Sequence, residues 1–455
     1  MAAELAGLLI VNAAYAAVGA AVLVLPGWVS REPATWYRLG AAYPIGIVAV
    51  VVPASYLALL QVPVSVTATV LGIVLVAAAT WRLRVWRRGF ARPRIGNGSF
   101  VARLLGLVIA VVLVYALRTF ATRPLLEWDS WVVWMSKARL LYENPSAAPA
   151  ALRSGSYGQA PYPLGLPTLE ALGFGAMGRF DGTVIAVQFL LLAMGFPLAL
   201  WSLLRDRARP WMIALTSLAI VCAPQLLFQL LTRYADVPLG LFVGLGLAAG
   251  AAWAVSQRSE RWLLGSFVLF VGMAGIVKSE GFLFAVAACV ALAAATLVAR
   301  SRARALEAAV AIAVVLAITL PWQLYCAVYG LSTQDYDLAN MVRPSYLSAH
   351  ADRLWPTVTE LSAQLADSNH WGLLTWVILL ALAVGLLAAR WRLLTFAGTW
   401  LVLAIGGLLM TYWVSVLPVE SHLTNTSYRT IVSLLIGGAA MVPLFVFPRP
   451  GLEAE

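Results

Sequence analysis

Apolar runs of about twenty residues recur along most of this 455-residue chain, separated by short stretches rich in arginine. A helix of about twenty apolar residues matches the hydrocarbon thickness of a bilayer. The runs lack strand-like alternation, and every backbone polar group in lipid must bond internally, so helices are favoured. The chain has 62% hydrophobic and 11% charged residues. An ordinary soluble domain has about 25% charged residues, so the composition excludes one. The sequence therefore predicts an all-α integral membrane protein.

Thirteen transmembrane helices are expected, with juxtamembrane helices in extracytoplasmic loops. They are placed near 4–26, 39–60, 64–81, 101–118, 181–204, 210–231, 237–255, 262–277, 281–299, 307–328, 371–389, 393–414 and 429–447. The first run has no basic segment before it, so it is taken as a membrane helix and not as a cleaved signal.

These helices divide the chain into five parts. The parts are a four-helix membrane segment at 1–118, a first large extracytoplasmic loop with an interfacial helix at 119–180, central membrane helices at 181–328, a second large loop at 329–370 and C-terminal membrane helices at 371–455. Loops of such length usually carry function.

The basic residues indicate how the helices are oriented. Twenty of the 31 Lys and Arg residues fall in loops on one side of the expected membrane, with only six of the 20 Asp and Glu residues. Cytoplasmic loops carry the excess of basic residues, which places the N-terminus outside and the C-terminus inside. The net charge of +11 therefore reflects topology, and no nucleic acid partner is expected. The three cysteines lie in or beside apolar runs without metal-ligand spacing, and are interpreted as core residues.

The first outer loop contains an aromatic repeat. Trp128, Trp131 and Trp134 recur every three residues, and Lys137 continues the series. On a helix this spacing predicts one aromatic stripe that lies at the lipid headgroups. An ordinary interfacial belt of tryptophans would give the same pattern.

Two carboxylates, Glu127 and Asp129, precede that helix directly after the fourth membrane helix. A carboxylate held at the membrane surface can take the proton of an acceptor hydroxyl. Lys137 and Arg139 follow at a distance suited to a phosphate headgroup. Acids at a helix start are also a common capping arrangement, so the local spacing leaves both interpretations open.

Three further motifs follow the acidic pair: YPLGLP at 162–167, RYADVP at 233–238 and GIVKSEG at 275–281. In this order, across roughly residues 100–290, the chain resembles the GT-C superfamily of multispanning glycosyltransferases, which use polyprenyl-phosphate-linked sugars. The last two motifs look like later segments of bacterial members related to the family-39 and Rgt-like enzymes.

The resemblance implies a hexosyl- or pentosyltransferase of the bacterial cell membrane that serves the cell envelope and is active on its extracytoplasmic side. Asp129 matches the catalytic base, with Glu127 as a neighbour or metal-linked partner. Many members have adjacent acids, whereas Trp128 separates them here, so which carboxylate acts and whether a divalent metal binds both stay open. The implied partners are a polyprenyl-phosphate sugar donor, a glycan or lipid-linked acceptor and membrane lipid. No other cofactor is implied.

Other polar positions fit a site for phosphate and sugar. Besides Lys137 and Arg139, they are Tyr162, Arg233, Asp236, Lys278, Glu280, His422 and Arg429. Plain alternatives exist, since Arg233 and Asp236 would also suit a local ion pair and Arg429 would also suit snorkelling to the interface. Lys278 is expected to face phosphate, because ionisable groups at membrane depth usually serve function. It is not expected to pair with Glu280, because residues two apart do not share a helix face.

The expected reaction is an inverting sugar transfer with Asp129 as base. One rival is a transporter or flippase of lipid-linked glycans, which would need ionisable groups deep in the bundle and usually an inverted repeat. The charges lie mostly at helix ends, and no repeat is visible in the sequence. The other rival, a non-catalytic scaffold of envelope synthesis, would have no use for Asp129.

Overall fold

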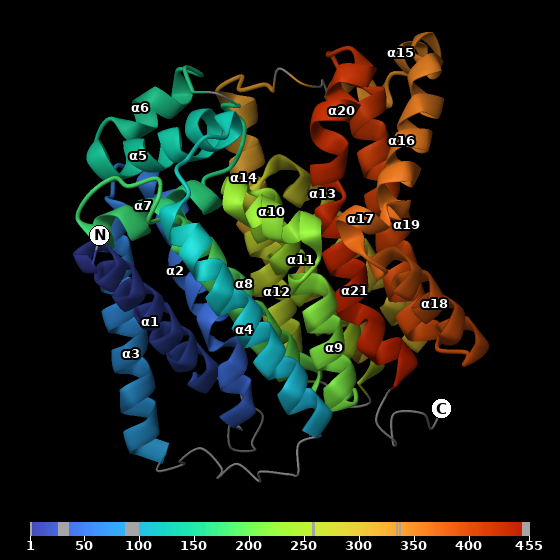
Figure 1. The fold of residues 1–455 in the computed structure, drawn as a ribbon, viewed down its shortest axis with the longest axis horizontal. Helices are drawn as coiled ribbons and strands as arrows, with labels where there is room; N and C mark the ends of the chain where they lie inside the picture. Colours follow the sequence, from blue (N-terminus) through green and yellow to red (C-terminus); the bar gives the residue numbers. More distant parts are fainter. Residues whose placement is uncertain are drawn as a thin grey trace.

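The computed structural model describes residues 2–25, 36–86, 100–157, 159–256, 260–333, 335 and 338–447. The regular elements in these ranges are helices, as expected (Figure 1). Nine spans in the described ranges are long and apolar enough to cross a membrane. They are α1 (Ala2–Val24), α2 (Ala42–Ala58) with the preceding η1 (Trp36–Ala41), α3 (Val64–Trp86), α8 (Ala186–Leu204), α11 (Asp236–Val255), α13 (Ser279–Ala299), α14 (Arg302–Val328), α19 (Trp391–Trp413), and α20 (Val419–Thr430) continued by α21 (Val432–Val446).

The expected number of thirteen spans is not reached. A tenth span is counted only if α9 (Pro210–Val221) and α10 (Pro224–Thr232), which are bent by 56° at their junction, cross together. Three other expected spans coincide with α4 (Phe100–Thr122), α12 (Arg261–Val277) and α18 (Leu374–Leu387), whose apolar stretches are only 10–17 residues long. The described residues therefore form a multi-pass helical membrane protein with nine or ten candidate spans.

Apolar side chains cover much of the outward surface of this bundle. Ile73 on α3 is 65% exposed, Val310 on α14 is 57% exposed and Leu387 on α18 is 87% exposed. A soluble protein rarely presents so much contiguous apolar surface, whereas lipid is a favourable solvent for it. Of the cysteines, Cys289 and Cys326 are buried as expected, and Cys222 is partly buried.

Helix α11 forms the centre of the bundle, and it packs against α21, α12 and α8 (Figure 1). Its close packing depends on glycine: a Cβ at Gly244 would lie 2.9 Å from the Ile436 side chain, and one at Gly246 would lie 2.7 Å from that of Val271. Small residues let membrane helices approach closely in this way. The packing fixes the N-terminal end of α11, where Asp236 lies, among its neighbours.

Short helices occupy the loops between the spans. In the first large loop they are η2 (Ser130–Met135), α5 (Ser136–Glu143), α6 (Ala148–Arg153) and α7 (Gly165–Met177); in the second they are η3 (Leu338–Val342), α15 (Pro344–Ala349), η4 (Ala351–Arg353), α16 (Leu354–Ala366) and α17 (Ser368–Trp371). Helices α5, α6, α15 and α16 gather at one end of the bundle, the upper end in Figure 1, and α20 leads from that end into α21.

Candidate functional site

Five ionisable side chains from separate segments form one continuous series of contacts, here called the charge chain. Its members, in order of contact, are Asp129, Arg429, Asp236, Lys278 and Glu280. Arg429 Nη2 lies 2.6 Å from Asp129 Oδ2 and 3.3 Å from Asp236 Oδ2. Lys278 Nζ lies 2.8 Å from Asp236 Oδ1 and 2.9 Å from Glu280 Oε1. The structure therefore joins five of the predicted site residues in a single cluster.

Helix ends bring these groups together. Asp236 and Glu280 lie in the first turns of α11 and α13, and Arg429 lies in the last turn of α20. The helix dipole favours acids at N-terminal ends, so Asp236 and Glu280 lie at suitable termini. Lys278 occupies the break between α12 and α13.

The charge chain is buried except at one end. The side chains of Asp236, Lys278, Glu280 and Arg429 are 3%, 5%, 9% and 9% exposed, whereas that of Asp129 is 28% exposed. Buried charges are tolerated when they are paired and hydrogen-bonded. A ligand can therefore contact the charge chain most readily at Asp129.

The expectation that Lys278 and Glu280 do not pair is wrong. The argument assumed a continuous helix, but the backbone of Lys278 is extended, with φ −150° and ψ 160°. That conformation allows its ammonium to reach Glu280 Oε1. Lys278 is therefore engaged by two carboxylates, those of Asp236 and Glu280.

Arg233 and Asp236 do not form the local ion pair that their spacing also suggested. The Arg233 guanidinium donates hydrogen bonds to the backbone carbonyls of Pro124, Leu231 and Arg123, at 3.1, 3.0 and 2.5 Å. Arg233 also ends α10 in the left-handed conformation, with φ 57°. Its contacts tie the segment before Glu127 to the α10–α11 junction, so its place is beside the charge chain and not within it.

Asp129 lies at the start of the π-helix η2. The segment is fixed there by a hydrogen bond from Ser130 Oγ to the Thr232 carbonyl and one of 3.1 Å from Trp131 Nε1 to the Leu125 carbonyl. Such π-helical turns are rare and occur frequently at functional sites. Glu127 points to a different partner, since its Oε1 lies 2.7 Å from Arg123 Nη2.

The three tryptophans do not form the single stripe that an α-helix would give. Trp128 and Trp131 are 65% and 45% exposed, whereas Trp134 is 1% exposed and stacks on Tyr162 with ring centroids 5.3 Å apart. A π-helix has more residues per turn than an α-helix, so residues three apart no longer share a face. Only Trp128 and Trp131 remain available as interfacial residues.

Lys137 and Arg139 do not reach the charge chain. The Lys137 ammonium is buried and donates to the backbone carbonyls of Gln159, Tyr162 and Ala160, at 2.7, 3.0 and 3.4 Å. Burial lowers the pKa of Lys137 to about 7. Arg139 is exposed and pairs with Glu143 at 2.8 Å. In the structure the partners of Lys137 and Arg139 lie within the first loop, and their expected contacts with phosphate stay a prediction.

Lys137→Met is expected to destabilise the protein by about 1–3 kcal/mol, because it leaves buried carbonyls without a donor. Arg139→Gln is the matched control, since it removes an exposed pair worth at most about 1 kcal/mol. Thermal unfolding in detergent measures both. Equal stability of the two variants would contradict a structural role for Lys137.

His422 lies on α20 but outside the charge chain. Its Nδ1 is 2.8 Å from Ser415 Oγ, and its ring packs against Tyr412 with centroids 4.9 Å apart. His422 was expected in the last outer loop and Arg429 at the start of the last span. In the structure both lie on α20, which begins at Val419.

Two further residues, one against Arg429 and one buried on α7, were not singled out from the sequence. The Tyr234 ring packs against the Arg429 guanidinium, whose carbon lies 3.9 Å from the ring centroid. Glu170 on α7 is wholly buried, and neither of its carboxylate oxygens meets a hydrogen-bond partner in the described ranges. Tyr234 was within the RYADVP motif, and a lone acid in an apolar run is a recognisable signal for Glu170.

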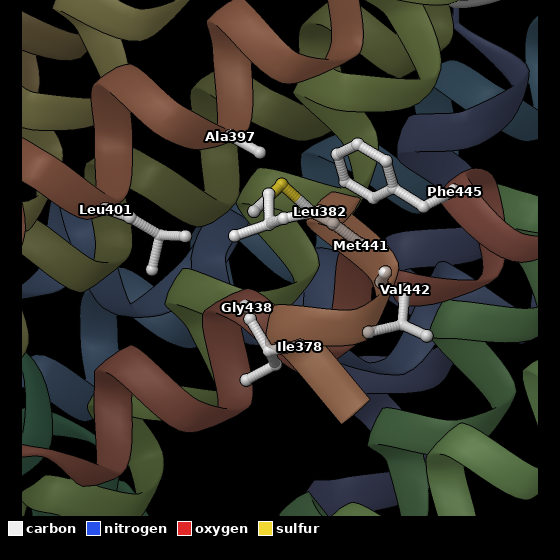
Figure 2. A pocket seen from close by; sticks show the side chains of 9 residues that line it. Ile378, Leu382, Ala397, Leu401, Gly438, Met441, Val442 and Phe445 are labelled. Atoms are coloured by element: carbon white, nitrogen blue, oxygen red, sulfur yellow. The ribbon is translucent and has the colours of Figure 1, made fainter. Parts of the chain in front are cut away.

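Within the part of the chain that the structure describes, neither a metal centre nor the apolar pocket shown in Figure 2 coincides with this cluster. Within the described ranges, no group of three His, Cys, Asp or Glu side chains could hold a metal ion. A pocket between α18, α19 and α21 is lined only by apolar residues and glycine, including Ile378, Leu401 and Phe445 (Figure 2). It offers no group for acid–base chemistry, so the charge chain remains the candidate site.

Comparisons of the chain with protein-family models, with curated proteins and with solved structures find no match in any of the three. The fold defines the class as a multi-pass, all-helical membrane protein. The resemblance to GT-C enzymes stays a prediction.

Proposed function

We propose that this protein is a membrane glycosyltransferase that moves a sugar from a polyprenyl phosphate to a hydroxyl acceptor. The observation that carries the proposal is the 2.6 Å contact between Asp129 and Arg429 at the partly exposed end of a buried charge chain. A carboxylate beside an anchored guanidinium supplies the two groups that such a displacement needs, a base and a stabiliser of the leaving anion.

In the proposed reaction, Asp129 takes the proton of the acceptor hydroxyl. The acceptor oxygen attacks the anomeric carbon, the bond from that carbon to the phosphate oxygen breaks, and the phosphate leaves with the electron pair. Arg429 stabilises the charge that develops on the phosphate. Attack opposite the leaving group inverts the anomeric configuration.

The remaining members of the charge chain position Arg429. Asp236 binds it through one carboxylate oxygen and binds Lys278 through the other. Lys278, which was expected to face phosphate, thus acts through Asp236 as a positioning residue. Glu127 contacts Arg123 and lies outside the charge chain, whereas Asp129 adjoins the Arg429 that would hold the phosphate, which favours Asp129 as the base.

The charge distribution supports a site on the extracytoplasmic side of a bacterial cell membrane. The positive-inside rule assigns the arginine-rich loops to the cytoplasm and the segment with Glu127 and Asp129 to the outside. Nucleotide sugars are cytoplasmic, so a site outside calls for a donor carried by lipid. A glycan or another lipid-linked molecule would supply the acceptor hydroxyl.

The donor class is tested with purified protein in proteoliposomes. Labelled polyprenyl-phosphate hexoses and pentoses are compared with the matching nucleotide sugars, in the presence of a membrane extract as the acceptor source. Transfer and release of polyprenyl phosphate are expected only from lipid-linked donors. Transfer from nucleotide sugars alone, or no release from any lipid-linked donor, would contradict the proposal.

A further inference from the structure

Arg429 is held unequally by its two acidic partners. Its Nε and Nη2 both donate to Asp236 Oδ2, at 3.3 Å each, and its guanidinium packs against the Tyr234 ring. A single contact of 2.6 Å joins it to Asp129. The Asp236 side chain is 3% exposed and that of Asp129 is 28% exposed, so the contact with Asp129 is the one open to exchange.

The balance of charge requires one carboxylate to give way when a phosphate binds Arg429. The charge chain contains three carboxylates and two cations. An arriving phosphate adds negative charge and requires a cation of its own. Asp236 loses a buried partner if it releases Arg429, which is costly, whereas Asp129 can turn to water or to an acceptor hydroxyl. Asp129 is therefore the group that phosphate displaces at the lowest cost.

We propose that Arg429 is a ligand-operated latch on Asp129. Arg429 engages Asp129 Oδ2, and a bound phosphate monoester or diester takes the place of that carboxylate and releases Asp129. The inference rests on the proposed function and adds a regulation to it: the base becomes available only after the donor has bound. Because competition for one guanidinium is reciprocal, Asp129 weakens phosphate binding as phosphate frees Asp129.

Equilibrium binding tests the latch without any measurement of catalysis. The probes are a labelled polyprenyl phosphate without sugar and inorganic phosphate, each titrated into the purified protein in detergent. Asp129→Asn removes the competitor and is expected to bind the lipid phosphate about ten-fold more tightly than wild type. Asp129→Glu keeps the competing charge and is expected to bind as wild type does. Circular dichroism and size-exclusion chromatography verify that each variant is folded.

Glu127→Gln is the matched control. It removes a nearby negative charge that contacts Arg123 and not Arg429, so its affinity is expected to stay within about two-fold of wild type. Equal tightening in Glu127→Gln and Asp129→Asn, or no tightening in Asp129→Asn, would overturn the latch and leave the proposed function standing. Absence of lipid phosphate binding to every protein would overturn both. The protein is expected to bind the lipid phosphate more tightly than inorganic phosphate. Equal affinity for the two would mean that the ligand that releases Asp129 is free phosphate and not the lipid-linked one.

Discussion

Replacing Asp129 with asparagine is expected to lower the kcat of sugar transfer by about a thousand-fold, because a positioned general base contributes about 10²–10⁴. The amide retains the size of the side chain but cannot accept the acceptor proton. The KM for the donor is expected to fall, since Arg429 no longer has to leave a carboxylate to bind phosphate. Steady-state kinetics with a polyprenyl-phosphate sugar measure both constants.

The matched variant Glu127→Gln decides which carboxylate is the base. Its kcat is expected to stay within a few-fold of wild type, because Glu127 contacts Arg123 and lies outside the charge chain. A large loss in Glu127→Gln together with normal turnover in Asp129→Asn would assign the base to Glu127. Normal turnover in both variants would contradict the assignment of a carboxylate base in this loop.

Asp236→Asn is expected to have the largest effect on stability, about 3–5 kcal/mol, because it leaves two buried cations short of a partner. Asp236 lies between Lys278 and Arg429, and its side chain is 3% exposed. The free energy of unfolding in detergent measures the change. Loss of transfer activity is expected to follow, since Arg429 would lose its anchor.

A double-mutant cycle separates this pairing from a general effect of substitution. Lys278→Met removes the second cation, so the double variant Asp236→Asn/Lys278→Met is expected to be more stable than the sum of the two single losses implies. The exposed Arg139–Glu143 pair is the control, and its loss is expected to cost at most about 1 kcal/mol. Additive losses at Asp236 and Lys278 would contradict a coupled charge chain.

The class of fold could be predicted because bilayer thickness sets the length of an apolar run. The number of spans could not, because an apolar run does not reveal where a helix ends. The chain bends by 56° between α9 and α10, inside the single span expected at 210–231, whereas the break at Lys278 falls where the spans 262–277 and 281–299 were expected to be separate. Such a bend depends on neighbours that are distant in the sequence.

The members of the charge chain could be predicted individually, but their pairing could not. Asp129 and Arg429 are brought together by the packing of whole helices, which no local spacing records. The partners of Lys137 could not be predicted for a related reason, because the carbonyls that its ammonium contacts belong to Gln159, Ala160 and Tyr162, between α6 and α7. Trp134 was misjudged because the segment is π-helical.

The position of a bound donor tests the central claim most directly. A structure of the protein in a lipid nanodisc with a non-transferable polyprenyl-phosphate sugar would show it. The proposed function predicts the phosphate within hydrogen-bonding distance of the Arg429 guanidinium and the anomeric carbon facing Asp129. A phosphate bound instead among the arginine-rich loops at the opposite side of the bundle would contradict it.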